Sequence, residues 1–206
     1  MNILTKIKNL LVESLKDNWK LIVGLYIVFI VLFAAAWLLS PAYVSSTVAQ
    51  LPANATAGNV GELADPVELF VLNEWGGILT YFLSVFFAVP AIVSLVYNAV
   101  NMGISGQLFS QIIPNGGAKF LIYLIPHGIF ELTATVIESA AGIMLFLFIW
   151  RFVRSWKSLG ASTSFENHKK ILIQSVVLMI FSTVLLLIAA PIESYFSVPF
   201  SEFFIH

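Results

Sequence analysis

Long runs of apolar residues constrain this chain more than any other feature of its sequence. The run from Leu21 to Leu39 contains no charged side chain, and neither does the run from Gly76 to Ile113. A helix needs about 20 predominantly apolar residues to cross the hydrocarbon core of a bilayer. Of the whole chain, 59% is hydrophobic and 10% is charged, whereas a soluble domain has about 25% charged residues. The sequence therefore predicts an all-α, polytopic membrane helix bundle embedded in a lipid bilayer.

Two of the predicted spans come from one apolar region. Residues 76–113 are too long for a single upright helix, because about 38 residues at about 1.5 Å each extend about 57 Å across a core of about 30 Å. We therefore divide this region between residues 96 and 97, and we expect Pro90 to kink its first half. A bent helix with a re-entrant piece is the alternative. The five predicted spans are residues 19–40, 76–96, 97–113, 128–150 and 171–190.

The positions of lysine and arginine predict the orientation, because cytoplasmic loops retain these residues. With five spans and a cytoplasmic N-terminus, nine of the 10 lysines and arginines lie in the cytoplasm, and Lys119 lies outside. Four spans, which count residues 76–113 once, would divide the 10 equally between the two sides. We expect a multi-pass protein of a prokaryotic plasma membrane, with a cytoplasmic N-terminus and an extracytoplasmic C-terminus.

The segments outside the predicted spans differ in character. Residues 1–18 are expected to form a cytoplasmic amphipathic N-terminus, and residues 41–75 an extracytoplasmic loop. The last part of this loop, 61–75, is acidic and has the spacing of a short interfacial helix. Asn54 begins an Asn-Ala-Thr glycosylation sequon. The tail, 193–206, is aromatic and mildly acidic, which suits the membrane interface.

Three ionisable side chains share one face of the helix predicted after Pro126. His127, Glu131 and Glu138 are spaced i, i+4 and i+11, which at 100° per residue gives offsets of about 0°, 40° and 20°. Ionisable groups are costly in hydrocarbon, so we expect this face to point into the bundle. The small residues that follow Glu138 would let another helix approach closely.

Polar side chains with similar spacing mark two further helices. On the preceding span they are Ser94, Asn98, Asn101 and Ser105, and near the last span they are Ser175, Ser182 and Glu193. The sequence therefore predicts a bundle whose inner faces carry carboxylates and an imidazole on one helix, and amides and hydroxyls on its neighbour.

A Pro-His-Gly sequence is predicted to break the helix where this polar face begins. Pro126 lacks an N–H group, and Gly128 tolerates unusual dihedral angles. Residues 120–125 would then form a short re-entrant half-helix. His127 would lie at a helix N-terminus, where free N–H groups favour an anion.

The paired imidazole and carboxylate leave three alternatives open. A divalent metal such as zinc would bind His127 and Glu131 and would need a third protein ligand. Candidates for that ligand are Asn98, Asn101 or a residue of another subunit. Alternatively, the pair belongs to a buried hydrogen-bonded network that fixes helix register, or to a proton or solute path along the polar face.

Other functional classes are excluded or disfavoured. The chain has no cysteine, which excludes disulfides and thiolate metal sites. Its net charge of −1, without clusters of basic and aromatic residues, argues against nucleic acid as a partner. No nucleophile elbow or phosphate loop is present, so no catalytic residue is predicted.

The middle of the chain resembles a known family. Asn101 and Gly106, a Pro-Asn-Gly turn, the sequence Ile-Pro-His-Gly-Ile-Phe-Glu ending at Glu131, and Ala-Ala-Gly ending at Gly142 occur in this order. Over residues 73–142 this order resembles the stage II sporulation protein M family of multi-pass membrane proteins from bacteria and archaea. The resemblance implies a membrane helix bundle. It also implies a scaffold role, since the spore-former member works with two other membrane proteins that remodel the cell wall.

Two functional hypotheses follow. The first is a non-enzymatic membrane scaffold or assembly protein. It would form homo-oligomers through its small-residue faces and contact other membrane proteins through its acidic outer loop and basic cytoplasmic loop. The alternative is an intramembrane metal- or proton-dependent enzyme or transporter centred on His127 and Glu131. That alternative requires these two side chains to meet Asn98 and Asn101 in one cavity.

Overall fold

The computed structural model describes residues 2–49 and 65–204. It is 92% helical, and the part of the chain that it describes contains no strand. The sequon at Asn54 and residues 50–64 of the predicted outer loop lie outside the described residues. The all-α fold class predicted from the sequence is therefore confirmed.

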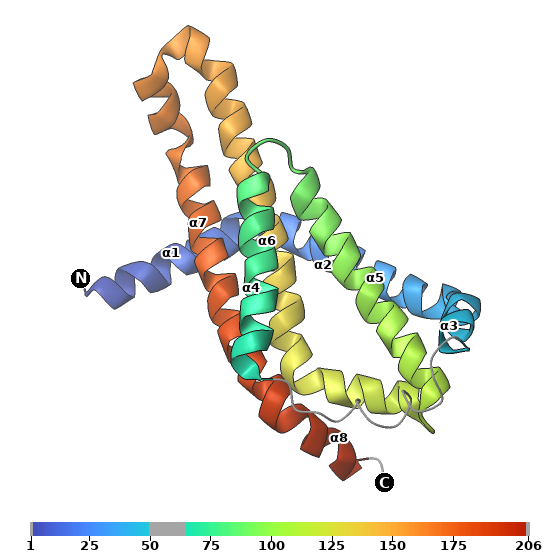
Figure 1. The fold of residues 1–206 in the computed structure, drawn as a ribbon. Helices are drawn as coiled ribbons and strands as arrows, with labels where there is room; N and C mark the ends of the chain where they lie inside the picture. Colours follow the sequence, from blue (N-terminus) through green and yellow to red (C-terminus); the bar gives the residue numbers. More distant parts are fainter. Residues whose placement is uncertain (1, 50–64, 205–206) are drawn as a thin grey trace.

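Eight α-helices and one π-helix follow one another along the described residues (Figure 1). They are α1 Ile3–Asp17, α2 Trp19–Leu39, α3 Pro41–Val48, α4 Pro66–Leu83, α5 Val89–Ile112, α6 Gly116–Leu159, α7 Ala161–Ile192, the π-helix η1 Glu193–Ser197, and α8 Val198–Phe204.

Four helical segments of the described chain are long and apolar enough to cross a membrane. They are α2, α5, α6, and α7 continued by η1. Helix α4 has 18 residues, which is about 27 Å at about 1.5 Å per residue. It contacts α5, α6 and α7 and lies across the face of the bundle (Figure 1). A bundle of about five spans agrees with this arrangement.

The division of the long apolar region falls elsewhere than predicted. Helix α4 ends at Leu83 and α5 begins at Val89, so the predicted boundary between residues 96 and 97 is wrong. Pro90 lies in the first turn of α5, where its missing N–H group costs nothing, and it does not kink a helix. Of the acidic segment 61–75, residues 66–75 are not a separate interfacial helix, because they form the first half of α4, and residues 61–64 lie outside the described residues.

Helix α6 is continuous through the predicted break. It runs for 44 residues with Pro126 in its interior, so residues 120–125 are not a separate half-helix. The first part of α6 nevertheless runs across the lower edge of the bundle before the helix turns upward (Figure 1). An interior proline removes one backbone hydrogen bond and bends a helix, which accounts for the change of direction.

Helices α6 and α7 form a long antiparallel hairpin that extends beyond the other helices (Figure 1). Gly160 connects them with φ of 78° and donates its N–H to Trp156 O at 2.9 Å. This left-handed conformation favours glycine. The basic loop expected between the spans 128–150 and 171–190 is therefore nearly all helical, with a single-residue turn at Gly160.

Small residues allow the helices of the core to approach closely. On α5, Ala99 and Gly103 are buried against α2, and a Cβ on Gly103 would collide with the backbone oxygen of Phe33. On α6, a Cβ on Gly142 would lie 2.9 Å from the Cβ of Ala91. Two polar residues of α5, Ser94 and Asn98, line a cavity together with residues of α4 and α6.

The N-terminal helix α1 is attached to α7 by charged groups. Lys170 Nζ lies 2.7 Å from Glu13 Oε1 and 2.8 Å from Asp17 Oδ2. Gln174 donates to the same Asp17 oxygen at 2.8 Å. The hydrogen bond from Lys170, followed by that from Gln174, lowers the pKa of Asp17. The amphipathic N-terminus predicted from the sequence thus has a specific docking place on the bundle.

Candidate metal centre

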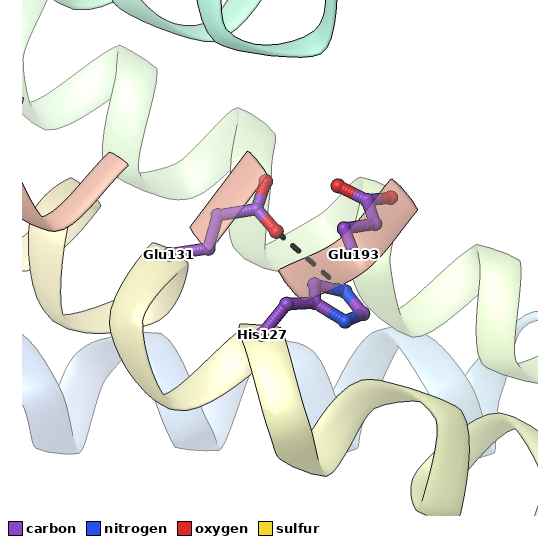
Figure 2. A group of neighbouring side chains, drawn as sticks. All are labelled: His127, Glu131 and Glu193. Atoms are coloured by element: carbon purple, nitrogen blue, oxygen red, sulfur yellow. Dashed lines mark ion pairs between the residues drawn. The ribbon is translucent and has the colours of Figure 1, made fainter. Parts of the chain in front are cut away.

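Three potential metal ligands converge where α6 meets η1. They are His127, Glu131 and Glu193, and one ligand atom of each lies within 4.8 Å of those of the other two (Figure 2). The Nε2 atom of His127 is 3.9 Å from Oε2 of Glu131. His127 is only 2% exposed. The cluster is therefore a shielded group of one nitrogen and several oxygen atoms.

The local structure explains why these residues meet. His127 and Glu131 are one turn apart on α6, so they share a face. Glu193 begins the π-helix η1, which contacts α6. Single π-helical turns are rare and occur often at functional sites. The wider turn presents both Glu193 and Ser197 to His127.

Hydrogen bonding assigns the tautomer of His127. The hydroxyl of Ser197 donates to Ile192 O at 3.2 Å, so its single hydrogen is used. With the hydroxyl hydrogen directed to Ile192 O, the 2.8 Å contact between this hydroxyl and Nδ1 of His127 corresponds to the tautomer in which Nδ1–H donates. A neutral imidazole protonated at Nδ1 carries a lone pair at Nε2. That lone pair is on the side of the ring that faces Glu131.

Each of the two carboxylates is held through one oxygen. Asn73 of α4 donates to Oε1 of Glu131 at 3.4 Å, and Tyr123 donates to Oε1 of Glu193 at 3.2 Å. The ring of Tyr123 also packs edge-on against His127, with centroids 5.0 Å apart. His127 and Glu131 thus each have one atom bound to an outer partner and one atom facing the other residue, as metal ligands usually have.

This donor set fits a divalent transition metal. Zinc is bound by histidine nitrogen and carboxylate oxygen at about 2.0–2.2 Å, so two tetrahedral ligands lie about 3.3–3.5 Å apart. The 3.9 Å separation of the His127 and Glu131 atoms would need to contract by about 0.5 Å, and separations in the cluster as large as 4.8 Å by about 1.4 Å. Three protein ligands leave a fourth position open, as in catalytic rather than structural zinc sites.

A polar cavity of about 490 Å³ adjoins the cluster, and Glu131 lines it. The cavity lies among α4, α5, α6 and α7. Its polar lining consists of Asn73, Thr80, Ser94, Tyr97, Asn98, Glu131, Thr135 and Glu138. The volume is within the range of about 300–1,000 Å³ that is usual for small-molecule sites.

The structure brings together only part of the polar set predicted from the sequence. Glu131, Glu138, Asn98 and Ser94 line one cavity, whereas Asn101 and Ser105 do not line it. Among histidine and acidic side chains, Glu193 is the third member of the cluster. His127 does not line the cavity either, so of the four residues expected to meet there only Glu131 and Asn98 do.

Sequence reasoning missed the partners that hold the cluster. Tyr123 and Ser197 carried no recognised signal, and Asn73 lay in a segment expected to be a loop. The one available signal was the recurrence of Ser175, Ser182 and Glu193 along the last helix, which marks an inward-facing polar line.

A comparison with known protein families gives one match to this chain. The family described as Stage II sporulation protein M matches residues 21–198. The chain belongs to the stage II sporulation protein M family. The match extends beyond residues 73–142, where the sequence resembles the family. It includes all three residues of the candidate metal centre. Searches of curated proteins and of solved structures gave no match.

Proposed function

We propose that this member of the stage II sporulation protein M family binds a divalent transition metal, zinc first, through His127, Glu131 and Glu193. The open position of the ion faces a ligand in the adjoining cavity. The supporting observation is the convergence of three potential ligand atoms within 4.8 Å of one another. A bound ion would act there as a Lewis acid on a carbonyl or phosphoryl oxygen, or on water.

The hydrogen bonding around the cluster supports a cation at this position. With Nδ1 of His127 donating to Ser197, the atoms that remain at the centre are an imidazole lone pair and carboxylate oxygens. All of these are acceptors. Acceptors that converge in a shielded site repel one another unless a cation lies between them. A divalent ion satisfies them together, which a simple register-fixing network would not do.

The cavity distinguishes this proposal from a purely structural metal site. Structural zinc sites are closed by four protein ligands, whereas sites that act on a ligand keep one position free. The side chain of Glu131 belongs both to the cluster and to the cavity wall. A molecule in the cavity would therefore lie beside the ion.

The direct test is the metal content of the purified protein. Wild type should carry close to one equivalent of metal after purification without added zinc, and His127→Ala, Glu131→Gln and Glu193→Gln should each lose it. The control is Glu166→Gln, since Glu166 is exposed on the hairpin and should keep the metal. Metal-free wild type, together with reduced thermal stability of the three variants, would refute the metal site and favour a structural network.

A scaffold role is the second candidate, and the α6–α7 hairpin favours it. The hairpin exposes Trp150, Val153 and Trp156 beside the basic residues Arg151 and Arg154. Exposed apolar patches with a polar rim are typical of protein or membrane contacts. We assign this surface to the cytoplasmic side, in keeping with the predicted orientation.

The scaffold role is tested by crosslinking in native membranes. A photoreactive residue at position 156 should crosslink to other membrane proteins. A second one at the exposed position 68 of α4 tests for crosslinks at the opposite end of the bundle. If both positions give only contacts between copies of this chain, the scaffold role in a larger assembly is refuted.

A further inference from the structure

A second pair of carboxylates lies at the side of the cavity away from the metal centre. Glu74 of α4 is 6% exposed, and its Oε1 accepts a hydrogen bond from Thr183 at 2.7 Å. Glu138 of α6 lines the cavity, whereas Glu74 does not line it and lies on α4 one turn from the lining residue Gly77. Neither Oε2 of Glu74 nor Oε1 of Glu138 has a hydrogen-bond partner among the described residues. Buried carboxylate oxygens without partners are rare and costly.

The carboxylate of Glu138 packs against helix α4 at Gly77. The absence of a side chain at Gly77 makes this possible. A Cβ on Gly77 would lie 2.5 Å from Oε1 of Glu138, so the carboxylate of Glu138 occupies the space that any larger residue would fill. Gly77 follows Glu74 by about one helical turn on the same face of α4, so the carboxylate of Glu138 at Gly77 is a neighbour of Glu74.

No positive side chain offsets these charges within the cavity. Its lining residues, all in the described part of the chain, include Glu131 and Glu138 but no lysine, arginine or histidine. Asn98 donates its amide nitrogen to Ser94 O at 2.9 Å, so its carbonyl oxygen remains available as an acceptor. The cavity therefore offers acceptors on a negatively charged wall, together with apolar surface from Leu72, Val93 and Leu186.

We infer that Glu74 and Glu138 bind the primary ammonium group of a small organic ligand whose body fills the cavity. An ammonium group has three N–H donors. Two of them satisfy the unpartnered oxygens of the two glutamates, and the third reaches an oxygen of the cavity wall. The apolar lining residues contact the carbon skeleton.

The volume argues for an organic cation rather than a bare ion. A proton shared between the carboxylates or an alkali ion would satisfy the same oxygens, but either would leave about 490 Å³ of partly apolar cavity unused. Glu131 and Glu138 are seven residues apart on one helix face, about 10.5 Å along the axis. A ligand with its ammonium group at Glu138 can thus extend to the metal centre.

This inference names the class of ligand for the proposed metal-dependent site. It rests on that proposal only for the end of the ligand opposite the ammonium group, which would reach the metal centre. The test therefore uses full-length protein stripped of metal by a chelator. Binding of n-butylammonium is measured by calorimetry and by the shift in unfolding temperature. The matched probes are n-butanol, which has the same shape without charge, and sodium chloride.

Butylammonium should bind wild type, and Glu138→Gln and Glu74→Gln should each weaken binding about tenfold or more, because each loses a hydrogen bond to a charged group. Glu68→Gln, exposed on α4, should bind like wild type. Two glutamate variants are made because the inference remains testable even if only one of them folds. Equal stabilisation by butanol or by sodium, an unchanged affinity in the folded variants, or no binding would overturn the inference. If wild type purified without chelator carries no metal and still binds butylammonium, the metal proposal fails and this inference stands.

Discussion

Replacing Ser197 with alanine tests the hydrogen bonding on which the metal centre depends. Ser197 accepts the Nδ1–H of His127 at 2.8 Å, and this bond leaves the Nε2 lone pair for the metal. Removing the outer partner of a metal ligand typically costs about 10- to 100-fold in affinity, or about 1.4–2.8 kcal/mol. In metal-free protein the buried N–H also loses its acceptor, which should cost about 1–3 kcal/mol of stability.

Zinc affinity is measured by competition with a chelating dye in detergent, and stability by thermal unfolding of the same samples. The matched control is Ser182→Ala. Ser182 of α7 is buried, as Ser197 of η1 is. It donates to Met179 O at 2.7 Å, and neither Ser182 nor Met179 belongs to the candidate metal cluster. The control should lose some stability and keep the affinity of wild type.

Two outcomes would refute this reasoning. If Ser197→Ala binds zinc as tightly as wild type, Ser197 does not orient His127, and the assignment of the Nε2 lone pair is wrong. If Ser182→Ala loses as much affinity as Ser197→Ala, the loss reflects general destabilisation of α7 and not the orientation of a ligand.

Three further predictions concern packing and docking. Gly77→Ala should weaken butylammonium binding, because its Cβ would lie 2.5 Å from a carboxylate oxygen of Glu138. Gly24→Ala, whose Cβ meets no described atom within 4 Å and which does not line the cavity, should bind like wild type, and equal affinities of the two variants would contradict the prediction. Gly103→Ala should lower the free energy of unfolding by about 1–3 kcal/mol through overpacking against α2, whereas Gly24→Ala in open space should change it by less than about 1 kcal/mol. Because the pKa of Asp17 is lowered by its lysine and glutamine partners on α7, docking of α1 should be complete above the ordinary carboxyl pKa and lost as pH falls through the lowered value. Hydrogen exchange in α1 should therefore differ between wild type and Asp17→Asn at neutral pH and become equal in acid.

Much of the fold could be predicted because its signals are local. An apolar run without charges predicts a membrane helix wherever it occurs. The spacing of Glu131 and Glu138 predicts a shared face from helical geometry alone, and both residues do line one cavity. Membership of the stage II sporulation protein M family, expected from the Pro-His-Gly region, is confirmed over most of the chain.

The breaks between helices could not be predicted in the same way. A proline in an apolar run either kinks a helix or begins one, and the sequence favours neither. Pro90 begins α5, whereas Pro126 remains inside α6. Packing decides between these outcomes. Ser84, at the end of α4, is fully buried, and a Cβ on Gly142 would lie 3.0 Å from its hydroxyl.

The sequence by itself determined that this protein is a helical membrane protein and which side chains share each helix face. The tertiary structure alone decided which faces meet, bringing Glu193 and Ser197 to His127, and Glu74 to Glu138. The physical reason is that helical spacing fixes a residue's angle about its own axis only. Which axes lie side by side depends on the summed packing of small residues, the bend of α6 and the π-helical turn, and no spacing within one helix encodes these.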